Sequence, residues 1–206
     1  MSSFLLSLDF ICRMMVQRYK IFFLFIFILN CYLVSCDSET SQKTVQPKGS
    51  NTIDMAQNIE VGSKAPEFSL PDQQGKRVNL SDYLGKTNLV VYFYPKDESY
   101  GCTKEACSFR DNYEVFKEAG AEVIGISSDD IASHQAFAAN HKLPFILLSD
   151  KDKTVAGKYG VGKSLGILPG RVTFVIDKHG IIRMMFSSQL NFEKHVEEAI
   201  AVLKGL

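Results

Sequence analysis

The sequence predicts an α/β fold in which one mixed β-sheet is flanked by helices. Apolar and β-branched runs alternate with helical patterns along the middle of the chain, which indicates parallel β-α-β units. Two later apolar runs flank the turn signal Asp177-Lys178-His179-Gly180, which indicates an antiparallel hairpin. Because the units and the hairpin follow one another without a linker, we expect them to share one sheet, with helices on both faces.

Each predicted element has its own signal. Strands are short apolar runs between turn residues, and helices show apolar residues every three or four positions. Pro95 ends the central run NLVVYFY, and Gly120 ends the longest helical pattern. The expected strands are 65–70, 78–80, 88–94, 122–127, 145–148, 172–176 and 181–186, and the expected helices are a brief one from 81–82, then 103–119, 131–140 and 192–203.

Composition restricts the classes of function. A chain of 206 residues holds one domain of ordinary size and an extension. Hydrophobic residues make up 46% and charged residues 22%, as in soluble globular domains. Lys+Arg and Asp+Glu both number 23, so there is no net positive charge to attract nucleic acid, and we expect no nucleic-acid partner.

The N-terminal part has the pattern of a targeting segment. Arg18 and Lys20 precede an apolar run over 21–35, which is shorter than the ~18–20 residues that span a bilayer. The run ends in Leu33-Val34-Ser35-Cys36, which resembles the bacterial lipobox, where a cysteine after a small residue is lipidated. We therefore expect a signal over 1–36, export, and anchoring in a bacterial envelope through a lipidated Cys36.

The same pattern leaves alternatives open. The run could be an uncleaved signal anchor, a plain secretory signal that gives a periplasmic protein, or part of a plastid route to the thylakoid. Translation could also start at Met14 or Met15. Residues 37–58 are polar and predict a flexible linker, so 59–206 is the expected folded domain, and membrane contact is expected only through the N-terminal segment.

The five cysteines fall into two groups. Cys12, Cys31 and Cys36 lie in the extension, and only Cys102 and Cys107 lie in the body. Two cysteines are too few for a disulfide-stapled scaffold, and the body is large enough to form a core without them. Two thiols near the end of a predicted strand are better interpreted as redox or catalytic groups.

Cys102 is the stronger candidate nucleophile. It follows the loop after strand 88–94, where open α/β sheets place ligands, and it stands at the expected entrance of helix 103–119. Free N–H groups and the positive end of the helix dipole stabilise a thiolate there. Since an ordinary cysteine is only a few per cent thiolate at neutral pH, this position supplies what a sulfur nucleophile needs.

Here the sequence resembles the peroxiredoxins. Their signature P-x-x-x-[TS]-x-x-C is met by Pro95, Ser99 and Cys102. Residues 93–111 are similar almost throughout to the branch called peroxiredoxin Q or bacterioferritin comigratory protein, and the similarity extends over 61–203.

The resemblance implies a fold and an activity. Residues 168–177, LPGRVTFVID, are similar to plastid and cyanobacterial members. The family implies a thioredoxin-like fold and a thiol peroxidase that reduces hydrogen peroxide and organic hydroperoxides without a cofactor. It also implies a monomer that thioredoxin or a similar dithiol protein recycles.

The resemblance also implies roles for the two cysteines. Cys102 is the expected peroxidatic cysteine, which a peroxide oxidises to a sulfenic acid. Cys107 is the expected resolving cysteine, which closes an intramolecular disulfide with it. Five residues along a straight helix separate two Cα atoms by ~8–9 Å, whereas a disulfide requires ~7 Å or less. We therefore expect the first turns of this helix to unwind after Cys102 is oxidised.

Four further residues complete the expected site. Ser99 is expected to hydrogen-bond the thiolate and the peroxide, and Pro95 to shape the loop. Arg171 is expected to hold the thiolate with fixed N–H donors, because the start of its hairpin strand can lie beside the end of strand 88–94. Glu105, one turn into the helix, could orient Arg171. The sequence departs from the family at Ser99, where threonine is usual, and at Tyr100, where proline is usual. With tyrosine in place of proline, the loop is expected to be less rigid.

Other interpretations remain to be compared. A membrane-tethered thiol–disulfide oxidoreductase usually carries C-x-x-C, which is shorter than the Cys102–Cys107 spacing. A non-catalytic module predicts no reactive thiol at all. Residues 157–164 match the phosphate-loop pattern G-x-x-x-x-G-K-[ST], but Pro169 and Gly170 break the helix that should follow. The four histidines show no metal-ligand spacing, so we expect no metal site and assign them surface or turn roles: His134, His141, His179 and His195.

Overall fold

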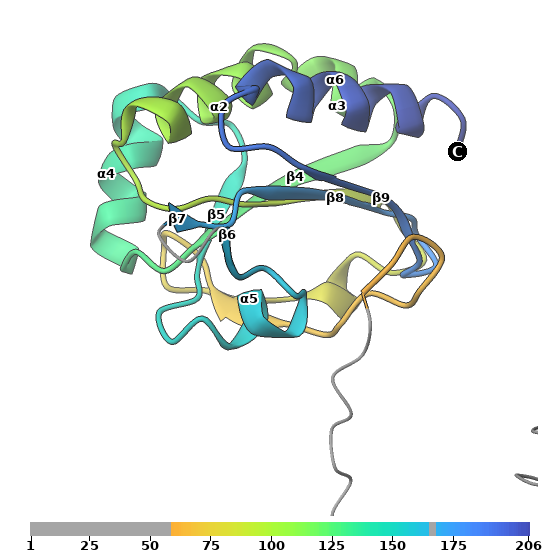
Figure 1. The fold of residues 1–206 in the computed structure, drawn as a ribbon, viewed down its shortest axis with the longest axis horizontal. Coiled ribbons are helices and arrows are strands. Elements are labelled where there is room, and N and C mark those ends of the chain that lie inside the picture. The colour runs from red at the N-terminus through yellow and green to blue at the C-terminus, as the bar shows by residue number, and fades with distance from the viewer. Residues whose placement is uncertain (1–58, 165–167) are drawn as a thin grey trace, which may run out of the picture. The chain divides into compact units, whose positions relative to one another are not determined.

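A five-stranded mixed sheet forms the centre of the computed structural model, which describes residues 59–164 and 168–206. The strands are β3 (Asn88–Phe93), β4 (Ala121–Ser127), β5 (Ile146–Ser149), β8 (Val172–Ile176) and β9 (Ile182–Ser187). Their order across the sheet is β5-β4-β3-β8-β9 (Figure 1).

The directions of the strands match the sequence prediction. Strands β3, β4 and β5 are parallel neighbours, whereas β8 is antiparallel to both β3 and β9. In the β3–β8 pair, Phe93 at the end of β3 is opposite Val172 at the start of β8. This register places Arg171, which precedes β8, beside the carboxyl end of β3, where the next loop begins.

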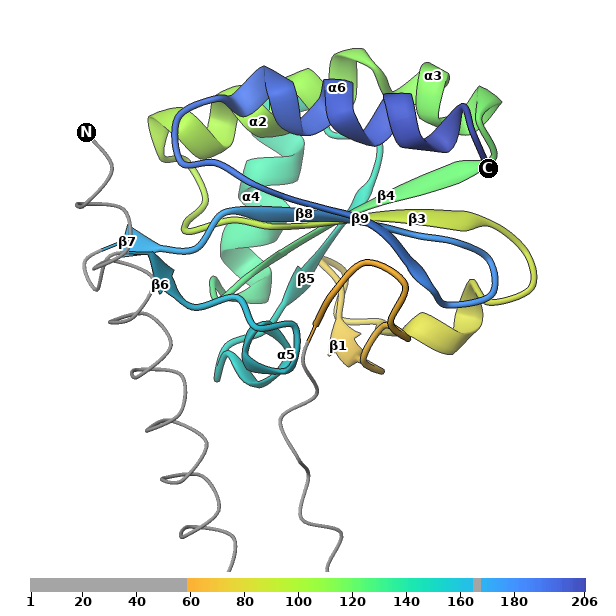
Figure 2. The same cartoon turned by 45° about the vertical axis from the view of Figure 1, so that its right-hand side comes forward.

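Helices cover both faces of the sheet (Figures 1 and 2). On one face lie α2 (Tyr100–Asp111), α3 (Tyr113–Glu118), α4 (Ile131–His141) and α6 (Phe192–Leu203). The other face is covered by α5 (Thr154–Lys158) and by the N-terminal hairpin, which consists of β1 (Ser69–Pro71), β2 (Arg77–Asn79) and the 3-10 turn η1 (Leu80–Asp82).

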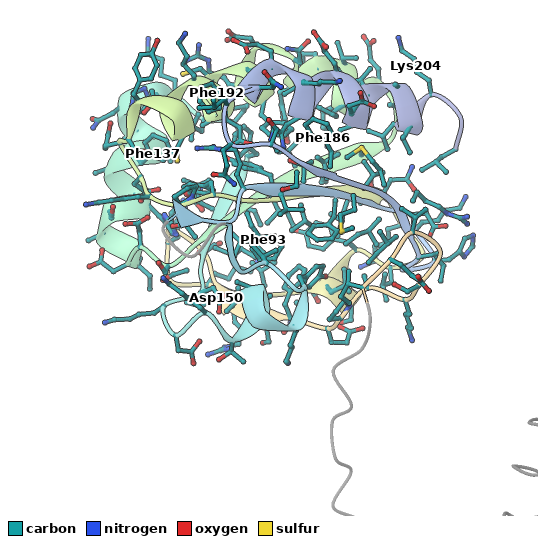
Figure 3. The ribbon with its side chains drawn as sticks, in the orientation of Figure 1. Phe93, Phe137, Asp150, Phe186, Phe192 and Lys204 are labelled. Carbon is teal, nitrogen blue, oxygen red and sulfur yellow. The ribbon has the colours of Figure 1, made fainter. Side chains whose placement is uncertain are left out.

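The sheet separates two apolar cores. Alternate residues of β3 point to opposite faces, so Val90 and Tyr92 pack with α2, α4 and α6, whereas Val91 and Phe93 pack with α5 and the N-terminal hairpin. Figure 3 shows Phe192 on the α6 side of the sheet and Phe93 on the opposite side. Burial of each large apolar side chain contributes about 1.5–3 kcal/mol, which explains why the central strand is apolar or aromatic from Leu89 to Phe93.

Several details differ from the prediction, including the first strand, which is Ser69–Pro71 instead of 65–70, and the start of the cysteine helix, which is Tyr100 instead of 103. The helical pattern over 103–119 is two helices, because the chain leaves helical geometry at Asn112, whose side chain donates to the Ser108 carbonyl at 2.9 Å. The short elements α5, β6 (Lys163–Ser164) and β7 (Leu168–Pro169) were not predicted. The phosphate-loop pattern begins inside α5 and ends in β6, so it lacks the strand-loop-helix context that phosphate binding requires.

The predictions for the N-terminal part lie outside the described residues. These are the signal over 1–36 with Cys36 and the linker over 37–58, and the boundary at residue 59 therefore remains a prediction. Within 59–164 and 168–206, no helix combines the length and the apolar character needed to cross a bilayer.

Candidate active site

The entrance of α2 places Cys102 in the interior of the domain. Ser99 is the N-cap residue of α2, with extended backbone angles, and its carbonyl accepts the first helical hydrogen bond from Thr103 at 2.8 Å. Cys102 is the third residue of the helix and is 1% exposed. Its thiol therefore lies within the first turn, where N–H groups lack intrahelical acceptors and favour negative charge.

Arg171, which lies just before β8 and far from Cys102 in the sequence, contacts this thiol. Its Nη2 donates to Cys102 Sγ at 3.3 Å, and its Nη1 forms an ion pair with Glu105 Oε2. The guanidinium carbon lies 4.9 Å from the centre of the Phe192 ring, over its face, in a cation–π contact. A buried cation with three fixed neighbours is a preorganised partner for a thiolate.

Glu105 is fully enclosed beside this cation. It lies on α2 one turn after Cys102 and is buried, and no hydrogen-bond partner contacts its Oε1 among the described residues. Burial raises the pKa of Glu105 to about 7, although Arg171 lowers it. The carboxyl group can therefore gain or lose a proton near neutral pH while it contacts Arg171.

A buried histidine lies on the far side of Glu105. His195 Nε2 is 3.0 Å from the Ser188 carbonyl, and Nδ1 is 2.8 Å from the Thr173 hydroxyl and 3.6 Å from Glu105 Oε1. Because a carbonyl only accepts, we assign the hydrogen to Nε2, and Nδ1 then accepts from Thr173. Burial lowers the pKa of His195 to about 4, so the ring is neutral at pH 7.

Gly101 allows this group of side chains to meet. A Cβ atom there would lie 2.7 Å from Phe192 Cζ and 3.2 Å from Arg171 Nη2. Glycine at this position thus permits the close approach of α6 and Arg171 to the first turn of α2.

Ser99 differs from the sequence expectation. Its hydroxyl donates to the Lys96 carbonyl at 3.0 Å, so in this structure it hydrogen-bonds its own loop rather than the thiol. Pro95 lines a cleft at the carboxyl ends of β3 and β4, together with Phe93, Val161 and Gly170. Tyr100 is 74% exposed, with Lys104 Nζ 4.9 Å from its ring centre.

The structure brings the two body cysteines onto one helix. Cys107 is a partly exposed free thiol five residues after the buried free thiol of Cys102. Arg171 contacts Cys102 Sγ and forms an ion pair with Glu105, whereas Pro95 and Ser99 lie in the segment between β3 and α2.

Sequence reasoning missed two buried histidines and the partly buried ring of Phe192, which contacts Arg171. The prediction of surface or turn roles was wrong for His134 and His195, which are fully buried. His195 and Phe192 lie at helix positions three apart, which is an ordinary core spacing. No local signal distinguishes them, because their partners come from α2, from β8 and from Arg171.

Fold and site together define a class of protein. A buried thiol at a helix entrance, held by a guanidinium and followed by a second thiol on the same helix, is the arrangement of a thiol-dependent redox enzyme. Residues 61–185 match the protein family described as the AhpC/TSA family. The chain therefore belongs to the peroxiredoxins, and it is a thiol-dependent peroxidase with a thioredoxin-like fold.

Individual relatives support this assignment. The chain is 47% identical over 176 residues to chloroplastic peroxiredoxin Q of Gentiana triflora, covering 85% of this chain and 81% of the relative. The crystal structure of peroxidoxin BcpB from Mycobacterium tuberculosis matches with a TM-score of 0.68 and 38% identity, over 72% of this chain and 99% of that one. The bacterioferritin comigratory protein of Xanthomonas campestris matches with a TM-score of 0.65 and 28% identity, over 72% and 97%.

The expected location in a bacterial envelope, through a lipidated Cys36, is wrong. Relatives at about half identity are chloroplastic peroxiredoxin Q proteins. The physical reason is that a lipobox is only four residues long. A basic and apolar segment that ends in a small residue and a cysteine therefore does not distinguish a lipoprotein signal from other targeting segments.

Proposed function

We propose that Cys102 is the peroxidatic cysteine and Cys107 the resolving cysteine of this peroxidase. The Cys102 thiolate attacks one oxygen of a hydroperoxide, the O–O bond breaks, and the released alkoxide takes up a proton. The products are a Cys102 sulfenic acid and an alcohol, or water when the substrate is hydrogen peroxide. The Cys107 thiol then attacks the sulfenic sulfur, which forms the disulfide and releases water.

The contact between Arg171 Nη2 and Cys102 Sγ at 3.3 Å carries this proposal. A guanidinium in this position stabilises the thiolate before attack and the charge that develops on the peroxide oxygens during it. Glu105 orients Arg171 through the ion pair, and the Phe192 ring contacts the guanidinium in the cation–π contact. Pro95 and Ser99 shape the loop that places the thiol.

Disulfide closure requires a change in α2. Both cysteines lie on a continuous helix, where residues five apart have Cα atoms ~8–9 Å from each other. A disulfide needs ~7 Å or less, so the first turns of α2 unwind when Cys107 reacts. Because both thiols belong to one chain, we propose that the monomer completes the cycle.

The family supports a proposal for the substrate and the reductant. The activity of a Xanthomonas campestris relative is described as alkyl peroxide reduction, which supports organic hydroperoxides as well as hydrogen peroxide for this chain. We propose thioredoxin or a similar dithiol protein as the reductant and the plastid as the compartment, since relatives are chloroplastic. The folded peroxidase domain is then 59–206, and the preceding residues serve targeting and linkage.

Peroxide consumption in the presence of a reducing system tests this function. Purified domain is mixed with thioredoxin, thioredoxin reductase and NADPH, and hydrogen peroxide or cumene hydroperoxide is added. We expect NADPH oxidation that needs both a peroxide and Cys102, and none with Cys102→Ser. Reduction of insulin disulfides without consumption of peroxide would instead identify a thiol–disulfide oxidoreductase.

A further inference from the structure

Glu98 has an unusual backbone conformation immediately before α2. Its φ angle is 55°, in the left-handed region that residues other than glycine rarely adopt. The next residue is Ser99, the N-cap of the helix that carries both cysteines. A strained residue at this point persists only where other contacts hold it in place.

The side chain of Glu98 supplies those contacts. Its Oε1 accepts a hydrogen bond from Asn140 Nδ2 at 2.9 Å, and its Oε2 lies 2.9 Å from His141 Nε2. Both partners belong to the last turn of α4. The bonds to His141 and Asn140 lower the pKa of Glu98, so the acceptor is a carboxylate.

The same turn of α4 also holds the other end of the cysteine segment. Arg110 Nη1, from the last turn of α2, donates to the main-chain carbonyl of His141 at 2.9 Å. Glu98 and Arg110 thus bracket the residues between them, which include Cys102 and Cys107.

The preceding residue is anchored more firmly. Asp97 is buried, and its carboxylate accepts from the Tyr94 hydroxyl at 2.8 Å and the Ser133 hydroxyl at 2.7 Å, with His134 Nδ1 at 2.8 Å. In contrast, the Glu98 side chain is 49% exposed. The chain is therefore held firmly up to Asp97, whereas the segment from Glu98 onward can detach from α4.

We propose that Glu98 is a positioning residue whose contacts with Asn140 and His141, the Glu98 latch, hold α2 in its helical form and release when α2 unwinds for disulfide closure. The inference rests on the proposed roles of the two cysteines. In the closure step, the Cys107 thiol and the Cys102 sulfenic acid form one S–S bond and one water molecule. Release of the latch also lets Glu98 leave its strained conformation, which favours the unwound form.

Removing the Glu98 latch shifts the equilibrium of α2 from its helical form toward its unwound form. Glu98→Gln loses the negative charge and one of the two acceptor oxygens, and His141→Ala loses one donor. Because these hydrogen bonds stabilise the helical form of α2, closure should accelerate about three- to tenfold in each variant. The sulfenic acid then persists for less time, so less Cys102 is oxidised further to sulfinic acid in excess peroxide.

The experiment follows closure and over-oxidation in the same samples. Reduced wild type, Glu98→Gln and His141→Ala are mixed with hydrogen peroxide, quenched with an alkylating agent at set times, and measured by mass spectrometry as thiol, disulfide and sulfinic forms. Amide exchange over 98–110 is compared in the reduced proteins, where the variants should exchange faster. Glu118→Gln, the same change at an exposed residue of α3, is the matched control.

Each outcome decides something. Faster closure and less sulfinic acid in both variants, with the control equal to wild type, support the latch. Closure that is equal or slower in both variants, while wild type forms the disulfide, overturns the latch and leaves the proposed function intact. Failure of wild type itself to form the disulfide overturns the proposed function and the latch with it.

Discussion

Arg171 Nη2 donates a hydrogen bond to Cys102 Sγ over 3.3 Å, although 69 positions of sequence separate the two residues. The antiparallel pairing of β8 with β3 creates this contact, since Val172 is opposite Phe93. The topology of the sheet therefore determines the electrostatics of the thiol.

Arg171→Lys is expected to slow the oxidation of Cys102 by about 10²-fold, the loss typical of removing one preorganised donor. Lysine keeps the charge, but a single ammonium cannot replace the planar fork that contacts Cys102 and Glu105 together. Stopped-flow measurement of thiol loss with hydrogen peroxide checks this. Arg183→Lys, at an exposed residue of β9, is the control, and equal rates in both variants would contradict the role of Arg171.

Glu105→Gln should change how stability depends on pH. Burial raises the pKa of Glu105 from 4.5 to about 7, so the folded state binds this proton more tightly than the unfolded state does. The protonated Glu105 therefore stabilises the wild-type fold. This contribution is complete below pH 4.5, is lost as pH rises through 7, and is at most about 3 kcal/mol. Relative to the wild type, the variant therefore gains stability between pH 5 and pH 8.

Urea unfolding at several pH values measures this difference in unfolding free energy. Glu197→Gln, an exposed change on α6, controls for the loss of one charge. A difference between wild type and Glu105→Gln that stays constant from pH 5 to pH 8 would show that Glu105 does not titrate in this range.

Gly101→Ala is expected to lower the rate of Cys102 oxidation by roughly tenfold. The new methyl group would meet Phe192 at 2.7 Å and Arg171 Nη2 at 3.2 Å, so both must move. A misplacement of about 1 Å can cost about 10²-fold in rate, so the displacement of a few tenths of an ångström expected at Arg171 accounts for the smaller loss. Gly157→Ala, at a helical glycine of α5 with open space around it, is the control and should keep the full rate.

Asp97→Asn should lower the free energy of unfolding by about 2–4 kcal/mol, because it leaves the buried His134 without its carboxylate. Burial alone would raise the pKa of Asp97, but the bonds from His134, Ser133 and Tyr94 lower it overall. Its stabilisation is therefore present above pH 3.8 and is lost as pH falls below that value. Thermal unfolding at pH 7 checks the cost, with the surface change Asp111→Asn as control. Equal melting temperatures for the two variants would show that the buried pair contributes little.

Much of the fold could be predicted from local sequence. The strand that reads NLVVYFY is buried on both faces, and the hairpin turn at 177–180 correctly indicated that β8 runs antiparallel. The prediction that Arg171 lies near Cys102 also followed from strand direction, and the structure confirms the contact. Short-range patterns were sufficient to predict a strand and the direction of the strand paired with it.

Other features depend on contacts that no local pattern contains. Asn112 divides the predicted helix because its side chain bonds the Ser108 carbonyl, a choice that sequence spacing does not reveal. His195 is buried because β8 and the chain before α6 supply partners for both of its ring nitrogens. The hydroxyl of Ser99 faces the Lys96 carbonyl, whereas the family signature suggested the thiol.

Intact-mass measurement of wild type, Cys102→Ser and Cys107→Ser after treatment with hydrogen peroxide tests the central claim most directly. We expect the wild type to lose two hydrogen atoms as the disulfide forms, Cys107→Ser to accumulate oxygen adducts at Cys102, and Cys102→Ser to remain unchanged. Oxidation of Cys102→Ser as fast as the wild type, or a wild type that does not change in mass, would contradict the assignment of Cys102 as the nucleophile.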